Sequence, residues 1–141
     1  MKKITASLAA LFCFLPYAYA NTQVLEEALT FLNDGKTDEA VSAVKTEILE
    51  EPDSAENYMA LGMIHLEKND YGSAKENLQK ALSINKKIVA AHYMLAMIYE
   101  KEGDIEAALQ KWGRIIKYTK NESLKSLAEK HLKQLKDGRN D

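Results

Sequence analysis

The side chains best suited to chemistry in this sequence are three histidines and one cysteine, and their spacing favours no reaction. His65, His92 and His131 lie 27 and 39 residues apart, so no two of them share a local motif. The patterns H-x3-H, C-x2-C and G-x-S-x-G, the P-loop and the dinucleotide-binding glycine pattern do not occur. Acidic pairs such as Glu26-Glu27 are typical of a solvated helix face. The sequence therefore predicts no catalytic residue, no metal site and no cofactor, and we expect that the protein is not an enzyme.

The first twenty residues differ in composition from all that follow. Lys2 and Lys3 precede an apolar run over residues 4–15, which is followed by Pro16 and then Ala18-Tyr19-Ala20. A positive start, a short apolar run and an A-x-A site are the parts of a secretory signal peptide. The run is shorter than the roughly 20 residues that cross a membrane. We expect cleavage after Ala20 and no stable membrane span afterwards; a retained membrane anchor is the alternative.

Cleavage at this point would change both the cysteine content and the charge of the chain. It removes Cys13, the only cysteine, so the mature chain forms no disulfide and carries no thiol nucleophile. It also leaves 17 basic and 21 acidic residues, a net charge of −4. Mild acidity gives no electrostatic reason for nucleic acid as a partner. The predicted location is the periplasm, and full secretion stays open.

Helices must position the remaining side chains, because apolar residues recur at helical spacing through most of the chain. In residues 55–85, two amphipathic patterns flank a polar turn at residues 68–71. Small residues stand where two helix backbones approach closely, at Gly62, Ala74 and Ala81. The stretch therefore predicts an antiparallel helical hairpin. Such a hairpin buries only part of its apolar surface, so it needs neighbours.

The chain supplies these neighbours at a fixed step of 34 residues, without insertions between copies. The pattern at Tyr58, Leu61, Gly62 and His65 returns as His92, Leu95, Ala96 and Tyr99. The polar turns align at the same step, at residues 34–37, 68–71 and 102–105. Three copies at one period of this length indicate a stacked solenoid of helical hairpins.

At these residues the chain resembles the tetratricopeptide repeat family, whose pattern is W-x2-L-G-x2-Y, then A-x3-F, then P. The middle copy reads Tyr58-x2-Leu61-Gly62-x2-His65 and then Ala74-x3-Leu78, and the third reads His92-x2-Leu95-Ala96-x2-Tyr99 and then Ala108-x3-Trp112. The first copy has Glu27 where leucine is expected but keeps Ala28, Phe31, Ala40 and Pro52. The resemblance covers residues 21–120.

The predicted fold is therefore all-α, a right-handed superhelical solenoid of three tetratricopeptide hairpins plus a C-terminal capping helix. The expected parts are a signal peptide at 1–20, repeats at 21–54, 55–88 and 89–121, a capping helix at 122–136 and a disordered tail at 137–141. Asp53 with Glu56 has the form of a capping box, and Asp70 and Asp104 are expected to cap later helices.

A second apolar stripe follows the first helix of each hairpin, about 100° around the axis from the core stripe. The resemblance implies that this face lines a concave surface which receives a partner's segment. The alternative is that these side chains fill contacts between helices. Methionine suits a surface that adapts to varied apolar partners. The candidate partner-binding residues are Leu25, Leu29, Leu32, Met59, Met63, Leu66, Tyr93, Met97 and Glu100.

The resemblance implies a non-enzymatic periplasmic adaptor or chaperone-like module. Its expected partner is a protein or peptide, for example a subunit of an envelope complex, whose apolar segment binds the concave face. The alternative function is structural self-assembly, in which the same apolar surface mates with another copy to give a homo-oligomer. The sequence names neither the partner nor the pathway, because repeats of this kind serve many.

Overall fold

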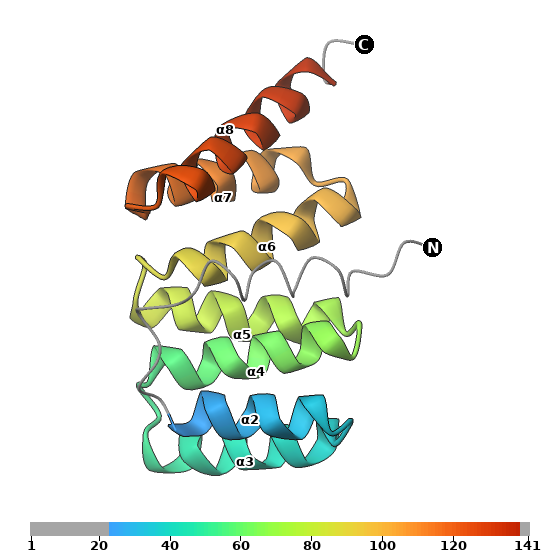
Figure 1. Ribbon diagram of the computed structural model, residues 1–141, viewed down its shortest axis with the longest axis vertical. Helices are drawn as coiled ribbons and strands as arrows, with labels where there is room; N and C mark the ends of the chain where they lie inside the picture. Colours follow the sequence, from blue (N-terminus) through green and yellow to red (C-terminus); the bar gives the residue numbers. More distant parts are fainter. Residues whose placement is uncertain (1–22, 139–141) are drawn as a thin grey trace. The chain divides into compact units, whose positions relative to one another are not determined.

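The computed structural model describes residues 23–138, and within this range the chain forms seven helices and no strand (Figure 1). The predicted signal peptide at 1–20 and residues 139–141 lie outside the described residues. The described chain divides between Asn85 and Lys86 into two compact units. The prediction of an all-α fold is confirmed. The right-handed superhelix concerns the arrangement of the two units and stays a prediction, as do the repeat boundaries.

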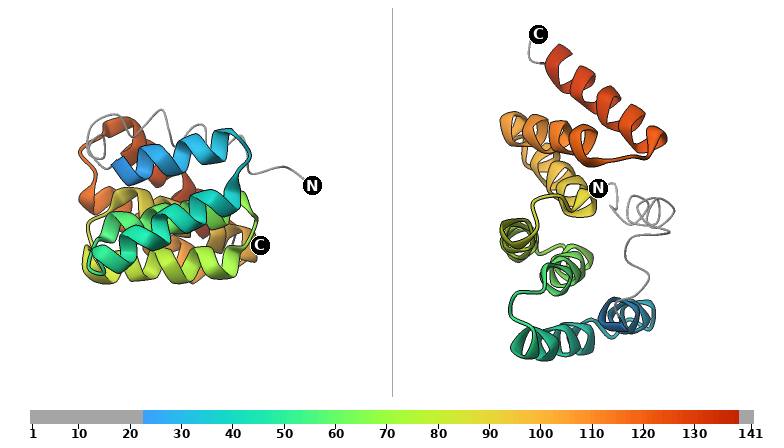
Figure 2. Two further views of the ribbon diagram at one scale, coloured as in Figure 1. Left: turned by 90° about the horizontal axis from the view of Figure 1, so that it is seen from below. Right: turned by 90° about the vertical axis from the view of Figure 1, so that its left-hand side faces the viewer.

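The first unit consists of two helical hairpins. Helices α2 (Gln23–Asn33) and α3 (Thr37–Glu50) form one, and α4 (Ala55–Glu67) and α5 (Tyr71–Ile84) form the other. Helix α4 packs against α2, α3 and α5 (Figure 2). Small residues on the facing helices let the backbones approach, and branched side chains fill the space beside them. Their shared core consists of Ala28, Ala40, Val44, Ala60, Leu61 and Ile64.

The second unit consists of one hairpin and a final helix. Helices α6 (Val89–Glu102) and α7 (Ile105–Tyr118) pair, and α8 (Glu122–Asp137) packs against α7. Because α8 covers apolar residues that the hairpin alone would expose, it acts as the expected cap, and it includes Asp137, one residue beyond the predicted end. The core consists of Ala96, Ala108, Trp112, Ile115, Leu124 and Ala128.

The turn of each hairpin is built in the same way at the 34-residue step. Gly35, Asn69 and Gly103 are the described residues with positive φ, at +73°, +58° and +77°. In each turn this residue donates its N–H to a carbonyl three residues back, and the next residue donates to one five residues back. This hydrogen-bond pair is the Schellman ending of a helix, which requires the left-handed conformation that glycine and asparagine tolerate best.

Side-chain caps fix where several helices begin, and one expected cap is wrong. Asp70 and Asp104 each accept a hydrogen bond of 3.1 Å from the backbone N–H three residues later, as predicted. Before α4, however, Ser54 and not Asp53 is the N-cap, and its Oγ accepts from the Asn57 N–H at 3.4 Å. Serine and aspartate both cap helices well, and the backbone path places Ser54 and not its neighbour at the start of the helix. Between residues 23 and 138 no helix is long and apolar enough to cross a membrane.

Candidate interaction surface

In the second unit, three predicted binding residues form one stripe along α6. Tyr93, Met97 and Glu100 are spaced by four and three residues, so they share a helix face, and all three are half-buried. The rings of Tyr93 and Trp112 are nearly perpendicular, at 88°, with centroids 5.5 Å apart. Tyr93 and Met97 both pack against the core of this unit. The stripe therefore combines the two expected roles, since these side chains pack against the core and also retain exposed area.

Glu100 joins all three helices of the second unit. Its Oε1 accepts a hydrogen bond from Nε1 of Trp112 on α7, and it lies 2.9 Å from Nδ1 of His131 on α8. The imidazole of His131 also stacks on the indole, with centroids 4.2 Å apart and planes 17° apart. Trp112 is fully buried, whereas the side chains of Glu100 and His131 are 22% and 23% exposed. The indole N–H, which burial would otherwise leave unpaired, is thus satisfied by a carboxylate at the surface.

The sequence predicts only part of this arrangement. It names Glu100 as a candidate binding residue, but it does not predict the contact of this residue with His131. The two residues are 31 positions apart, and no periodic pattern links a carboxylate on one helix to an imidazole two helices later. Replacement of the family's phenylalanine by tryptophan at position 112 is the one signal that a polar partner is needed.

In the first unit, most of the predicted stripe is buried. Met59, Met63 and Leu66 on α4 are 2%, 5% and 6% exposed. Leu29 and Leu32 on α2 are half-buried, and Leu32 packs against the core of this unit. Leu25 lies within α2, but its side chain is outside what the structure describes. The predicted residues thus belong to two units, and a single binding surface formed by all of them stays a prediction.

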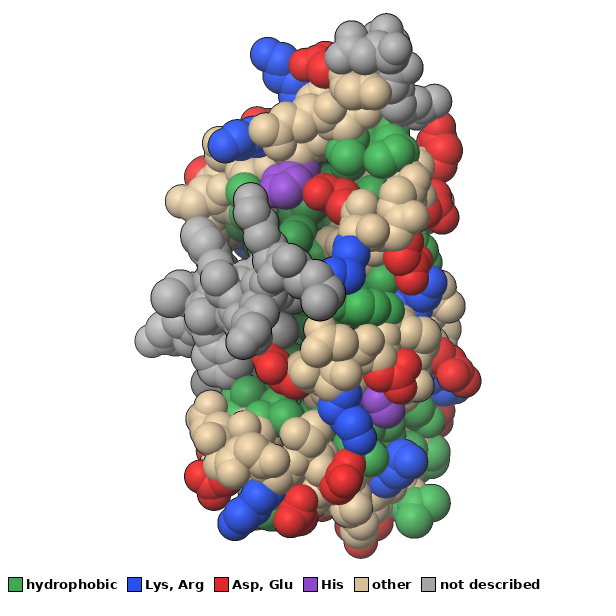
Figure 3. All heavy atoms as spheres, turned by 90° about the vertical axis from the view of Figure 1, so that its right-hand side faces the viewer, with side chains coloured by type: hydrophobic (Ala, Val, Ile, Leu, Met, Phe, Trp, Pro, Cys, Tyr) green, Lys and Arg blue, Asp and Glu red, His purple; other side chains and the backbone are tan. Residues whose placement is uncertain are grey.

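The first helices of the hairpins carry an acidic set of charges. Together α2, α4 and α6 hold six glutamates and one lysine, Lys101. On the face shown in Figure 3, hydrophobic side chains lie exposed between acidic and basic ones. Taken unit by unit, the first helices carry four glutamates and no lysine in the first unit, and two glutamates and one lysine in the second.

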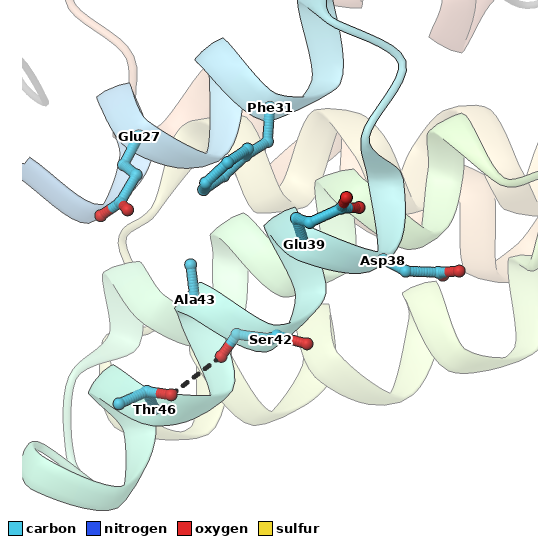
Figure 4. A pocket seen from close by; sticks show the side chains of 7 residues that line it. All are labelled: Glu27, Phe31, Asp38, Glu39, Ser42, Ala43 and Thr46. Atoms are coloured by element: carbon cyan, nitrogen blue, oxygen red, sulfur yellow. Dashed lines mark hydrogen bonds between the residues drawn. The ribbon is translucent and has the colours of Figure 1, made fainter.

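A shallow depression of about 610 Å³ lies between α2 and α3 (Figure 4). Phe31 and Glu27 extend from α2 on one side, and Asp38 lies at the edge formed by α3. Asp38 pairs with Lys68 at 2.8 Å, and this ammonium lowers the pKa of its carboxyl. The depression is lined by Glu27, Phe31, Asp38, Glu39, Ser42, Ala43 and Thr46.

The other histidines have structural contacts. Nε2 of His92 lies 2.9 Å from the Lys86 carbonyl oxygen, and its ring stacks on Tyr118 at 5.8 Å. Burial lowers the pKa of His92, although the carbonyl acts in the opposite direction. His65 lies 3.3 Å from Asp70, the cap of α5. Among residues 23–138, no group of three or more histidine, cysteine or acidic side chains is arranged to hold a metal ion.

Comparison with known families decides the family of this chain. Two models described as tetratricopeptide repeat match, one over residues 25–86 and the other over residues 65–130. The chain belongs to the tetratricopeptide repeat family. This repeat is a protein–protein interaction fold. A search among curated proteins found no significant match.

Solved tetratricopeptide structures share the fold at low sequence identity. The first such domain of Spaghetti (RPAP3), bound to the HSP90 peptide SRMEEVD, matches with a TM-score of 0.71 and 14% identity over 84% of this chain and 94% of that one. The second domain of human RPAP3, in complex with the HSP70 peptide SGPTIEEVD, matches with a TM-score of 0.67 and 16% identity. This match covers 80% of this chain and 92% of that one. The MamA protein matches with a TM-score of 0.67 and 20% identity over 97% of this chain and 68% of that one. At these identities the likeness shows the fold alone.

Proposed function

We propose that this protein is a non-enzymatic binding module that holds an apolar segment of another cell-envelope protein against the half-exposed face of α6. The observation that carries the proposal is the stripe of Tyr93, Met97 and Glu100 on α6. It offers an aromatic ring, a thioether and a carboxylate on one half-exposed face of an interaction fold. Aromatic and methionine side chains are enriched where proteins bind one another, and methionine adapts to varied apolar partners.

The charges of the first helices indicate the chemistry of the bound segment. Two solved relatives of this fold hold the acidic peptides SRMEEVD and SGPTIEEVD. Here the first helices carry four glutamates and no lysine in the first unit and two glutamates and one lysine in the second, so either unit by itself would repel an acidic peptide. A segment that alternates apolar residues with lysine or arginine would instead be attracted. We therefore propose that the partner's segment is apolar and basic.

The proposed place of action is the periplasm, which rests on the signal peptide predicted at residues 1–20. Mass spectrometry of the protein purified from its own cells tests this part. A first residue of Asn21 supports export and cleavage, whereas retention of Met1 in a membrane fraction argues for an anchor.

Peptide binding tests the function itself. Two labelled twelve-residue peptides with the same leucine pattern, one bearing lysines and the other glutamates, are titrated with the protein and followed by fluorescence anisotropy. The lysine peptide should bind more tightly. Met97→Lys should weaken this binding about tenfold or more, because it removes apolar contact and adds repulsion.

The matched control is Leu49→Lys, which adds the same charge at an 84% exposed leucine on α3. It should leave binding of the lysine peptide unchanged. Circular dichroism melts verify that both variants stay folded. Equal affinity for the two peptides, or equal effects of the two substitutions, would contradict the proposed surface.

A further inference from the structure

The charges of this chain are segregated along its sequence. Residues 23–67 carry eleven acidic and two basic side chains, a net charge of −9. Residues 68–138 carry fourteen basic and nine acidic side chains, a net charge of +5. The small net charge of the whole chain conceals this separation. Opposite potentials on two regions of one molecule favour association of the acidic region of one copy with the basic region of another.

The acidic surface with a shape that accepts a partner is the depression between α2 and α3. Glu27 and Glu39 line it and have no ion-pair partner among the described residues. Asp38, at the rim, is already paired with Lys68. Phe31 and Ala43 add apolar area between the carboxylates (Figure 4). Two free carboxylates beside a half-buried aromatic ring suit a side chain that has an apolar stem and a positive end.

Side chains of this kind project from the outer face of α8. The inner face of this helix packs against the Trp112 core through residues such as Leu124 and Ala128. The other face carries Glu129 and four lysines whose ammonium groups form no ion pair or hydrogen bond within the described residues: Lys125, Lys130, Lys133 and Lys136. Lysine stems can cover apolar surface while their ammonium groups reach carboxylates. This face is therefore chemically complementary to the depression.

We propose that two copies of this chain associate head to tail, with the lysine face of α8 from one copy in the acidic depression between α2 and α3 of the next. Contact of either face with its own equivalent is disfavoured by like charge, so the interface is heterologous. This surface differs from the stripe on α6, and the inference does not depend on the proposed peptide binding. Because the pairs are exposed, the association is weak and decreases with salt.

Sedimentation velocity of the full chain tests this inference at high protein concentration. In about 20 mM salt, where screening is weak, the weight-average mass should rise with concentration, and in about 300 mM salt the dissociation constant should be about tenfold higher or more. Two charge-reversal variants are compared, Glu27→Lys/Glu39→Lys and Lys130→Glu/Lys133→Glu. Each should be monomeric alone. An equimolar mixture should associate again, because each variant keeps the face that the other has lost.

The matched control is Glu76→Lys, which reverses an exposed charge on α5 outside both faces. It should associate like the natural chain, and circular dichroism checks that every variant is folded. A chain that stays monomeric at low salt would overturn the proposal. So would association that neither double variant weakens, or variants that do not complement each other in the mixture, since both would place the contact elsewhere.

Discussion

The hairpins α4/α5 and α6/α7 are two copies of one pattern, but they fill the space between their helices differently. In the first, Gly62 lies so close to α5 that an added Cβ would be 2.7 Å from Cγ of Leu78. Thirty-four residues later the same two positions hold Ala96 and Trp112. Here a Cβ is present, and the larger side chain stacks on His131 of α8. In each hairpin, the space left by the residue on the first helix thus matches the size and direction of the side chain on the second.

Because of this difference, the packing of the third hairpin involves the final helix. Leu78 is fully buried and carries no polar atom that requires a partner. Trp112 is also fully buried, but its N–H bonds to Glu100, which lies beside His131. The third copy therefore depends on a side chain from α8 in a way that the second copy does not. Equivalent substitutions in the two hairpins should therefore differ in how much unfolding free energy they cost and in whether they loosen α8.

Truncation of the tryptophan should have the largest effect. Trp112→Ala leaves a cavity among α6, α7 and α8 and should lower the free energy of unfolding by about 3–5 kcal/mol. Chemical denaturation followed by circular dichroism measures this loss without the tryptophan signal. Hydrogen exchange should also become faster in α8, because the substitution removes the surface on which His131 stacks.

Leu78→Ala is the equivalent truncation in the second hairpin and serves as its control. It should cost about 2–5 kcal/mol, but under native conditions it should leave hydrogen exchange in α8 unchanged. If both variants loosened α8 alike, the difference drawn between the hairpins would be wrong.

How much the sequence predicts depends on the distance over which each signal acts. The turns at Gly35, Asn69 and Gly103 and the caps at Asp70 and Asp104 depend on a few adjacent residues, and the structure confirms the caps. The prediction of Asp53 as a cap is wrong because Ser54, the next residue, can accept the same hydrogen bond and only the backbone path decides between them.

The candidate site was harder to predict because α4 and α6 are apolar on most of their sides. Nine of the thirteen residues of α4 are buried, including Met59 and Met63. A helix of this kind has no strong periodic signal, so the pattern does not say which stripe faces solvent. The contact of Glu100 with His131 has no sequence signal for another reason. It depends on how α8 packs against the hairpin, and no local pattern encodes that packing.

A methyl group added to Gly62 tests the close approach directly. Gly62→Ala should destabilise the protein by about 1–3 kcal/mol, because the new Cβ would overlap Leu78 and lie 3.3 Å from the Ala74 carbonyl oxygen. Thermal and denaturant unfolding measure the change. In the Leu78→Ala background the same substitution should cost less, because only the contact with the Ala74 carbonyl oxygen remains and alanine is the better helix former.

Gly113→Ala provides the matched control in the other hairpin. Gly113 lies within α7, is exposed, and has no atom within 4 Å of an added Cβ. This substitution should therefore stabilise the protein by about 1 kcal/mol. A Gly62→Ala variant that gained stability as Gly113→Ala does would show that α4 and α5 tolerate a wider spacing.

The smallest expected effect concerns pH and another pair of equivalent positions, Tyr58 and His92. Tyr58 is half-buried, and the Lys80 ammonium lies 5.6 Å from the centre of its ring. His92 is 5% exposed, its Nε2 lies beside the Lys86 carbonyl, and its Nδ1 has no hydrogen-bond partner among the described residues. The neutral ring satisfies this site by donating Nε2–H to the carbonyl, whereas a charged ring would bury a second, unpaired N–H.

Burial lowers the pKa of His92 below its ordinary value of 6.5, and the positive charges of Lys111 and Arg114 lower it further. Above pH 6.5 the ring is neutral in both the folded and the unfolded chain, so its contribution to stability is fully present. As the pH falls through 6.5, the unfolded chain binds a proton that the folded chain still excludes, and stability is lost.

The natural protein should therefore lose more unfolding free energy between about pH 7.5 and about pH 5.5 than His92→Tyr, which has the residue of the second copy. Urea denaturation at the two pH values measures both losses. The contributions of the other titrating groups cancel in the comparison, because both proteins contain them. Equal losses in the two proteins would show that His92 accepts its proton without cost in the folded state.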